Sequence, residues 1–412
     1  MLHIPALVGH QEVEKLFRDL ESPGSEDRSL AMPAHAKFVE PGAEAALVQF
    51  LTTWVSKVPG NALHVVRSNG QSDSVALEDL SQSHYGLTAL ALSAEIMCDG
   101  LSCMGSAHRA LKKRLLKISD PDVTNAASRG AISLMCVDEM PDVILSSFYH
   151  ESPDVEGSLK GFEEFEDVAD DLLSYPERIE GLFPVNPGKK LDAGRGLISR
   201  ILYELFRNTQ DHARRLWDGS INPSSIRGVL VARHTRSYSE WAECLSNCQP
   251  VSTYVHSLLS SLNKEIAKYE RMPHGQIAVS EKSRLTLLEI SITDSGSGLA
   301  QHYLRTDLTQ SPLPAKREHD AVVECFNKHA TSTNNPSRGL GLHRVLTCLT
   351  DLGGFLRIRT GHLNLYRDLV LRPYGQQQIF HDWDTSGPAT HNIHPMALGT
   401  VVTVLIPVRS YE

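Results

Sequence analysis

Three polar side chains able to do chemistry lie close together in the segment LYELFRNTQDHA, positions 202–213. The apolar residues of this segment recur at helical spacing, which predicts an amphipathic helix. Glu204, Asn208 and Asp211 follow one another at intervals of four and three residues, so they share one stripe of that helix. Such a stripe is either a solvated face or the lining of a polar site.

A second motif, DSGSG at positions 294–298, stands at the end of a predicted strand with alternating apolar residues. Asp294 in this position can accept a hydrogen bond from an exocyclic amine, such as the one adenine offers. Gly296 and Gly298 allow the backbone to turn tightly and approach a ligand. The alternative is an ordinary Asp-Ser-Gly turn with no ligand.

The third motif, RGLGL at positions 338–342, opens a predicted helix. Glycines before a helix expose backbone N–H groups, and the helix N-terminus carries partial positive charge, so the pair suits phosphate. The segment lacks both the GxxxxGK[ST] pattern of a P-loop and the GxGxxG pattern of a dinucleotide-binding turn.

These motifs, in this order and followed by the strand GTVVTVLIP, together resemble the GHKL ATPase family. That family includes DNA gyrase, the 90-kDa heat-shock chaperones and histidine kinases. The resemblance covers roughly residues 190–410, about half of the chain. It implies a Bergerat-type α/β sandwich, in which helices cover one face of a mixed sheet and ATP binds between them.

The resemblance also implies roles for the polar stripe. Asn208 corresponds to the Mg²⁺ ligand, and one amide oxygen is sufficient because magnesium retains most of its waters. Glu204 corresponds to the general base that orients or deprotonates the attacking water. Asp211 corresponds to a polar position beside the nucleotide.

At the other end of the implied site, Asp294 would read adenine and Thr400 would support it, often through water. The remaining implied contacts belong to the turn under the base and the turn beside the phosphates: Gly296, Gly298, Arg338, Gly339, Gly341 and Leu342. Residues 299–338 would form the ATP lid. Lys328, His329, Ser332 and Thr333 of that lid either reach phosphates or remain solvated.

The chain has 412 residues, a length typical of two or three domains. Alternating strands and helices predict a small α/β domain of unknown role, sensor or adaptor, at 1–185. The segment PVNPGKK at 184–190 predicts a domain boundary, and an ATP-binding domain is expected after it at 190–412. An insertion at 235–283 is either a helix for a partner or dimer contact, or a surface excursion.

Individual elements follow from periodicity and turn signals. Helices are expected at 41–58, 84–97, 107–118, 161–183, 192–216 and 251–270, and within 338–354. Strands are expected at 62–67, 130–139, 226–234, 355–361 and 399–408, and within 284–300.

The composition is that of an ordinary globular protein, with 41% hydrophobic and 22% charged residues. A formal net charge of -9 gives no general attraction to nucleic acid or to an anionic membrane. With no apolar run long enough to span a bilayer and no signal peptide, the expected location is the cytoplasm. The seven cysteines lack the spacing of a zinc site and are expected to be reduced, mostly buried thiols.

The leading functional hypothesis is an Mg-dependent ATP-binding switch with modest ATPase activity. It would act on a partner protein, on a second protomer or on its own N-terminal domain. One alternative is a protein kinase that transfers the γ-phosphate to Ser or His of a separate partner. Another is an ATP-binding interaction protein without catalysis.

Overall fold

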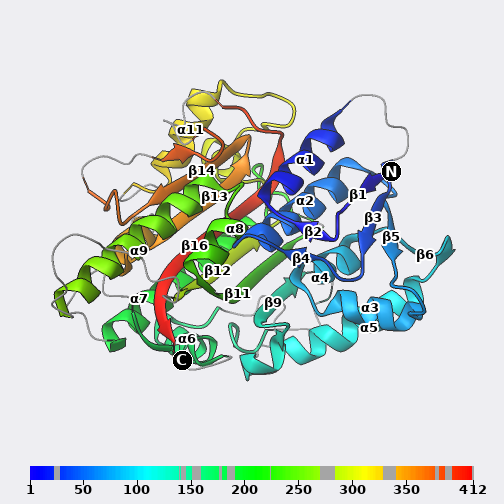
Figure 1. Ribbon diagram of the computed structural model, residues 1–412. Helices are drawn as coiled ribbons and strands as arrows, with labels where there is room; N and C mark the ends of the chain where they lie inside the picture. Colours follow the sequence, from blue (N-terminus) through cyan, green and yellow to red (C-terminus); the bar gives the residue numbers. More distant parts are fainter. Residues whose placement is uncertain are drawn as a thin grey trace.

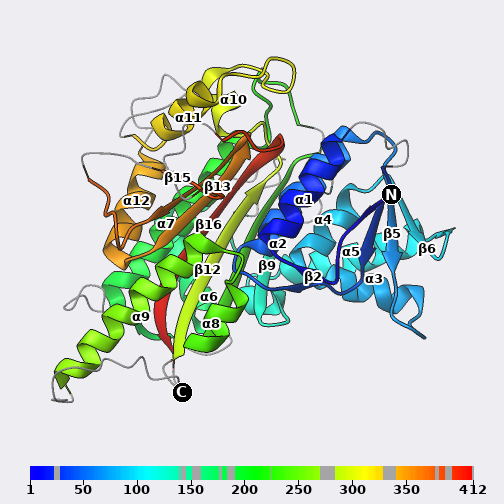
Figure 2. The same ribbon diagram turned by 45° about the horizontal axis from the view of Figure 1, so that its top comes forward.

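A computed structural model defines the fold. The structure describes residues 1–22, 28–138, 140, 145–150, 159–175, 179–182, 191–222, 224–269, 284–327, 340–375, 380–385 and 392–410. For 179–182, 191–193, 262–269 and 409–410 it describes the backbone alone. The chain is an α/β protein, as predicted, built around one large sheet with a smaller sheet beside it (Figures 1 and 2).

The helices of the described residues are α1 (His10–Glu21), α2 (Ala43–Lys57), α3 (Asp73–Ser81), α4 (His84–Leu92), α5 (Met104–Ile118), α6 (Phe162–Ser174), α7 (Leu191–His212), α8 (Tyr238–Cys244), α9 (Gln249–Tyr269), α10 (Leu299–Leu304), α11 (Ala315–Glu324) and α12 (Gly341–Leu352), with a 3-10 turn at Val123–Ala126.

The strands are β1 (Leu2–His3), β2 (Leu7–Val8), β3 (Leu30–Pro33), β4 (Lys37–Phe38), β5 (Ala62–Val66), β6 (Glu95–Cys98), β7 (Leu101–Ser102), β8 (Ala127–Ser128), β9 (Ala131–Val137), β10 (Ile179–Leu182), β11 (Ile226–Ser237), β12 (Arg284–Asp294), β13 (Phe355–Gly361), β14 (Leu363–Asp368), β15 (His381–Asp382) and β16 (Ala397–Ser410).

Most of the described strands belong to a large antiparallel sheet or to a small, mainly parallel one, and β2 and β4 form a separate parallel pair. The large sheet has the order β15-β14-β13-β16-β12-β11-β9-β8, and β10 pairs with β16. All its described pairings are antiparallel, whereas the resemblance implies a mixed sheet. The small sheet has the order β1-β3-β5-β6-β7, with parallel pairing from β1 to β6.

Helices cover both faces of the large sheet, rather than one as the resemblance implies. On one face α7 and α12 pack against β11, β12 and β16. On the other, α2 packs against β12 and β16, and α8 and α9 cover the adjacent part (Figure 2). Ten of the eleven β12 residues are therefore buried or partly buried, with Leu285 and Leu287 under the α9 side and Ile290 in the larger core on the other.

The segment 235–283 supplies part of this cover. Val255 and Leu258 of α9 join Trp241 of α8 in a second hydrophobic core with Leu405 of β16. The hydroxyl of Tyr254 donates to the Gly353 carbonyl at 2.9 Å. The described part of the predicted insertion is thus a layer of the fold and not a surface excursion.

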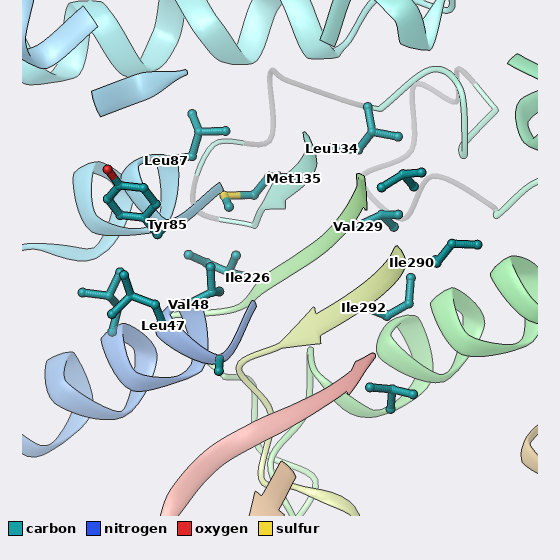
Figure 3. Packing of buried hydrophobic residues seen from close by; sticks show 14 of the residues in the cluster. Leu47, Val48, Tyr85, Leu87, Leu134, Met135, Ile226, Val229, Ile290 and Ile292 are labelled. Carbon is teal, nitrogen blue, oxygen red and sulfur yellow. The ribbon is translucent and has the colours of Figure 1, made fainter. Parts of the chain in front are cut away.

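The large sheet also crosses the expected boundary near residue 185. Strand β9, predicted at 130–139 as part of the N-terminal domain, pairs with β11 from Ala131↔Ala232 to Val137↔Ile226. One hydrophobic core joins Leu47 and Val48 of α2 to Ile290 and Ile292 of β12 (Figure 3). The large sheet and the main hydrophobic core therefore contain residues from both halves of the chain.

Most predicted helices and strands are present, with bounds within a few residues of those predicted. Two predicted helices are replaced by strands over their last residues. The helix predicted at 84–97 ends at Leu92, because a strand, Glu95–Cys98, then joins the parallel sheet. The helix predicted at 161–183 ends at Ser174, and residues 179–182 pair with β16 instead. Both endings reflect strand pairings with distant segments, which override local helical periodicity.

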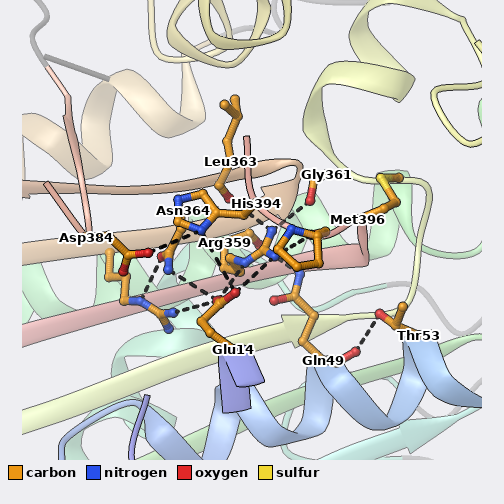
Figure 4. A network of polar contacts seen from close by, with 12 residues as sticks. Glu14, Gln49, Thr53, Arg359, Gly361, Leu363, Asn364, Asp384, His394 and Met396 are labelled. Carbon is orange, nitrogen blue, oxygen red and sulfur yellow. Dashed lines mark hydrogen bonds and ion pairs between the residues drawn. The ribbon is translucent and has the colours of Figure 1, made fainter. Parts of the chain in front are cut away.

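A buried polar network connects α1 to the β13–β14 hairpin (Figure 4). The Glu14 carboxylate accepts hydrogen bonds from Arg359 Nε at 2.9 Å and Asn364 Nδ2 at 3.3 Å. Burial raises the pKa of Glu14, but Arg359, His394 and Arg357 outweigh that effect and hold it below its ordinary value. The N-terminal segment is thus joined to the large sheet by a desolvated ion pair.

Among the residues that the structure describes, no helix is long and apolar enough to cross a membrane.

Replacing Glu14 by Gln removes the charge that compensates the buried Arg359 while preserving shape. We expect the free energy of unfolding, measured by urea denaturation, to fall by about 3–5 kcal/mol, the cost of breaking a buried ion pair from one side. The matched control is Asp19→Asn, which breaks the exposed Lys15–Asp19 pair of the same helix and should cost less than about 0.5 kcal/mol. Equal losses in the two variants would show that the Glu14 network does not stabilise the fold.

Candidate functional site

The polar stripe of α7 lies beside a buried apolar stripe, as its spacing predicts. Leu202 and Phe206 are fully buried in the main core. Glu204 is only 4% exposed, so the solvated-face alternative fails for this residue. Asn208 and Asp211, one and two turns further along, are partly buried.

The start of α12 contacts the middle of this stripe. A Cβ atom at Gly341 would lie 3.0 Å from Oε2 of Glu204 and 3.8 Å from Oδ1 of Asn208. Leu342, the next residue, is buried and anchors the first turn of α12 in the core. The first and third sequence motifs therefore meet, and glycine is what permits this close approach.

Two arginine side chains lie beside the Glu204 carboxylate. Arg344, on the first turn of α12, donates from Nη1 to Oε1 of Glu204 at 2.8 Å. Arg200 lies one turn earlier on α7, with Nη1 3.9 Å from the same oxygen. The Arg344 side chain is 45% exposed, so the pair lies at the edge of solvent.

The second motif forms a turn fixed by its own side chains. Asp294 Oδ1 accepts the Gly296 N–H at 2.9 Å, the pattern of an Asx turn. Ser295 Oγ accepts the Ile226 N–H, and Ser297 Oγ accepts the Trp217 N–H, each at 2.8 Å. The segment is therefore a turn in the structure, with Gly298 at a φ of 87° that favours glycine.

This turn contacts the end of α7. A Cβ atom at Gly296 would lie 2.7 Å from the His212 carbonyl oxygen and 3.0 Å from Ala213 Cα. On its other side, the Gly399 N–H donates to the Gly296 carbonyl at 2.7 Å. Helix α7 thus touches both glycine turns, one at Glu204 and Asn208 and the other at its C-terminus.

Thr400 lies opposite Asp294 in the β12–β16 register. Its backbone N–H acts to lower the pKa of the Asp294 carboxyl, and its hydroxyl lies 3.3 Å from that of Thr360.

Burial raises the pKa of Asp294 to about 6, although the backbone donors at Gly296 and Thr400 and the charge of Arg227 act to lower it. Asp294 is consequently ionised at neutral pH and titrates in mildly acidic solution. Burial disfavours the ionised form of this carboxylate, and an additional hydrogen-bond donor would stabilise that form.

Sequence reasoning did not identify Arg227, which faces Asp294 across the β11–β12 pair. Arg227 is 4% exposed and donates from Nη2 to Asp138 at 2.5 Å. It also donates to the Tyr149 hydroxyl at 2.5 Å and contacts the Gln210 side chain of α7. No local signal marks this cluster, because it depends on the pairing of β9 with β11.

The predicted lid is in part a packed segment. Leu308, Val322 and Phe326 are buried in the main core, and Glu318 accepts the His362 N–H at 2.8 Å. The His302 ring of α10 lies 4.2 Å from the His212 ring, between centroids. Burial lowers the pKa of His302, with Arg305 adding to the effect and Asp211 opposing it. The remaining lid residues Lys328, His329, Ser332, Thr333 and Arg338, and Gly339 of the third motif, lie outside the described residues.

One amide, that of Asn208, lies where the resemblance implies an Mg²⁺ ligand. Among the described residues, no group of three or more His, Cys, Asp or Glu side chains is arranged to hold a metal. Asn208 is different: its Nδ2 is buried and makes no hydrogen bond to the described chain. A buried amide nitrogen without a protein partner is a donor that a ligand oxygen can satisfy.

Comparisons with protein-family models, curated proteins and solved structures give no match to this chain. The chemistry assigned to the site therefore depends on its own residues and on the motif resemblance.

Gly296→Ala would place a methyl group against the immobile backbone of α7. We expect it to lower the free energy of unfolding by about 1–3 kcal/mol, measured by urea denaturation. The control is Gly105→Ala in α5, where a Cβ meets nothing within 4 Å and should stabilise the helix by up to about 1 kcal/mol. A neutral Gly296→Ala would mean that the turn is not packed on α7.

Proposed function

We propose that the chain binds ATP with Mg²⁺ between α7, the 294–298 turn and the start of α12, hydrolyses it slowly, and acts as a nucleotide-controlled switch. One observation carries the proposal: α7 contacts both glycine turns, Gly341 beside Glu204 and Gly296 beside His212. The eight residue-to-residue steps from Glu204 to His212 span about 12 Å of helix. That length matches an extended nucleoside triphosphate with its base at one turn and its phosphates at the other.

At the base end, Asp294 would accept the exocyclic amine of adenine. The carboxylate is ionised at neutral pH, and an added N–H donor favours that form. Gly296 and Gly298 would contribute indirectly, because they let the turn pack closely on α7 and β13 and so position Asp294.

At the phosphate end, the N-terminus of α12 would face the negative charge. The first backbone N–H groups of a helix have no partner within the helix and attract anions. Asn208 would hold Mg²⁺ through its amide oxygen, and the bound ion would neutralise phosphate charge. Arg344 and Arg200 add positive charge at the same end.

Glu204 would be the general base, and its pairing with Arg344 would govern the rate. While Arg344 donates to Oε1, that oxygen is not available to a water proton. A phosphate near the half-exposed Arg344 competes for its guanidinium. Movement of Arg344 to phosphate would free Glu204 to accept the proton of the attacking water.

The same ion pair favours a second candidate, an ATP-binding interaction protein without hydrolysis. If Arg344 remains on Glu204 when nucleotide is bound, the base stays occupied. Transfer of the γ-phosphate to a separate protein, the kinase alternative, would appear as labelled partner instead of free phosphate.

The chain's own N-terminal region is the first partner we propose for the switch. Gln49 Nε2 of α2 donates to the Arg359 carbonyl at 2.9 Å and lies 3.4 Å from the Gly399 carbonyl. Thr53 Oγ1 accepts the Leu398 N–H at 2.9 Å. Residues 398–399 therefore contact α2 on one side and the Gly296 turn on the other, so a shift of that turn on binding would reach α2 directly.

Glu204→Gln tests catalysis separately from binding. We expect ATP affinity, measured calorimetrically with Mg²⁺, to change little and phosphate release to fall by about 10²- to 10⁴-fold, the usual contribution of a general base. Asn208→Ala should weaken Mg-ATP binding, because the amide oxygen is lost. The matched control is Glu163→Gln on the exposed face of α6, which should leave both quantities unchanged. Failure of the wild-type chain to bind ATP at all would refute the proposed function.

Adenosine binding should depend on pH through Asp294. Since only the ionised carboxylate is a full acceptor, affinity should be constant above about pH 7 and fall by up to tenfold per pH unit below about 6. Adenosine is preferred to ATP here because it carries no titrating phosphate. Fluorescence titration at several pH values measures the effect, and Asp294→Asn should abolish the slope. A flat wild-type profile would remove Asp294 from the site.

A further inference from the structure

Two cysteines meet at the edge of the small parallel sheet, in a region that the proposed nucleotide site does not use. Cys98 is the last residue of β6, and Cys103 immediately precedes α5. Their Sγ atoms are 2.8 Å apart. Cys98 is 1% exposed, and Cys103 is partly exposed.

A tight hairpin holds the two thiols together. Residues 99 and 100 form its turn, both with positive φ, and Cys98 pairs with Leu101 across it. The Cys103 N–H then donates to the Ile96 carbonyl at 2.8 Å. A disulfide bond is about 2.05 Å long, so the two sulfurs need to approach by less than about 1 Å to bond.

We propose that Cys98 and Cys103 are a redox-active dithiol that forms a reversible intramolecular disulfide by exchange with a small-molecule disulfide such as oxidised glutathione. The sequence alone predicts reduced thiols here, because a spacing of five residues fits no zinc or CxxC pattern. The two thiols come into contact because the hairpin after β6 reverses the direction of the chain.

The more exposed Cys103 is the thiol that reacts first. It is the N-cap residue of α5, where the helix N-terminus favours a thiolate. Burial raises the pKa of Cys103, and a hydrogen bond from the Cys98 S–H acts to lower it. Burial also raises the pKa of Cys98, to about 12, with Cys103 and Asp73 adding to the effect and Arg67 opposing it.

The exchange balances in two steps. The Cys103 thiolate attacks one sulfur of oxidised glutathione, forms a mixed disulfide and releases one glutathione thiolate. Cys98 then loses its proton, attacks Cys103 Sγ and displaces the second glutathione thiolate. The protein loses two electrons and two protons, and oxidised glutathione becomes two molecules of glutathione.

The charges around the pair belong to the β5–α3 loop, to the first residue of α3 and to the hairpin turn. Arg67 pairs with Asp73 at 2.7 Å and contacts Asp99. Because both thiols have raised pKa values, the rate of exchange should increase with pH above neutrality as thiolate accumulates. The bond would close a loop of only a few residues, so little gain in global stability is expected.

The test uses the full chain, first reduced and then equilibrated with buffers of defined glutathione to oxidised-glutathione ratio. After alkylation of free thiols, peptide mass spectrometry should find Cys98 and Cys103 joined, with loss of two hydrogen atoms, and dithiothreitol should restore both thiols. In Cys98→Ser, Cys103 should stop at a stable mixed disulfide with glutathione. In Cys103→Ser, Cys98 should stay unmodified because it is buried.

Cys244 and Cys248 serve as the matched pair. They are one residue closer in sequence, and Cys244 Sγ accepts a hydrogen bond from Arg236. The double variant Cys244→Ser/Cys248→Ser should form the Cys98–Cys103 bond at the same glutathione ratio as wild type. Absence of the bond in folded protein under a large excess of oxidised glutathione would overturn the proposal, as would a bond that dithiothreitol does not reduce.

Discussion

The pairing of β12 with β16 is the constraint on which the rest of the structure depends. The two strands run antiparallel from Thr286↔Val408 to Asp294↔Thr400, and they occupy the centre of the large sheet. Because helices cover both faces, neither strand can shift register by one residue without exchanging the two sets of side chains. The register that buries both faces also fixes Asp294 beside the Thr400 backbone and the Gly399 turn. Core packing and site geometry are thus consequences of one strand alignment.

Buried charges then determine how the N-terminal segment lies on this sheet. Glu289 of β12 accepts from His234 at 2.8 Å and from the Gly42 N–H at the start of α2 at 2.9 Å. Glu14 of α1 pairs with Arg359 of β13. Each pair is desolvated, so it discriminates strongly between the observed docking and any arrangement that would leave a charge alone. Apolar contacts alone would tolerate sliding of α1 and α2, whereas these hydrogen bonds do not.

The sequence predicted what local pattern controls and missed what strand pairing controls. Helical spacing identified α7 and its polar stripe, and the glycines marked turns that the structure brings against that helix. The same reasoning could not place β9 in the large sheet, since an apolar strand does not specify its partner. Arg227 was missed for that reason: its contacts come from β9, β12 and α7 together. The helix expected at 84–97 failed in its last turns because pairing of 95–98 with β5 outweighs helical periodicity.

The two carboxylates of the proposed site, Glu204 of α7 and Asp294 of β12, are held in contrasting ways, and the contrast bears on the proposed switch. Glu204 is paired with Arg344, whose exposed guanidinium is open to competition from an anion. Asp294 accepts from backbone donors, and burial raises its pKa to about 6, so a further donor would stabilise its charged form. A ligand that carries an amine at one end and phosphates at the other would donate a hydrogen bond to Asp294 and, at the same time, compete with Glu204 for Arg344. Neither adenosine nor inorganic phosphate can do so alone. If the proposed function holds, coupling between the two ends would require the whole nucleotide.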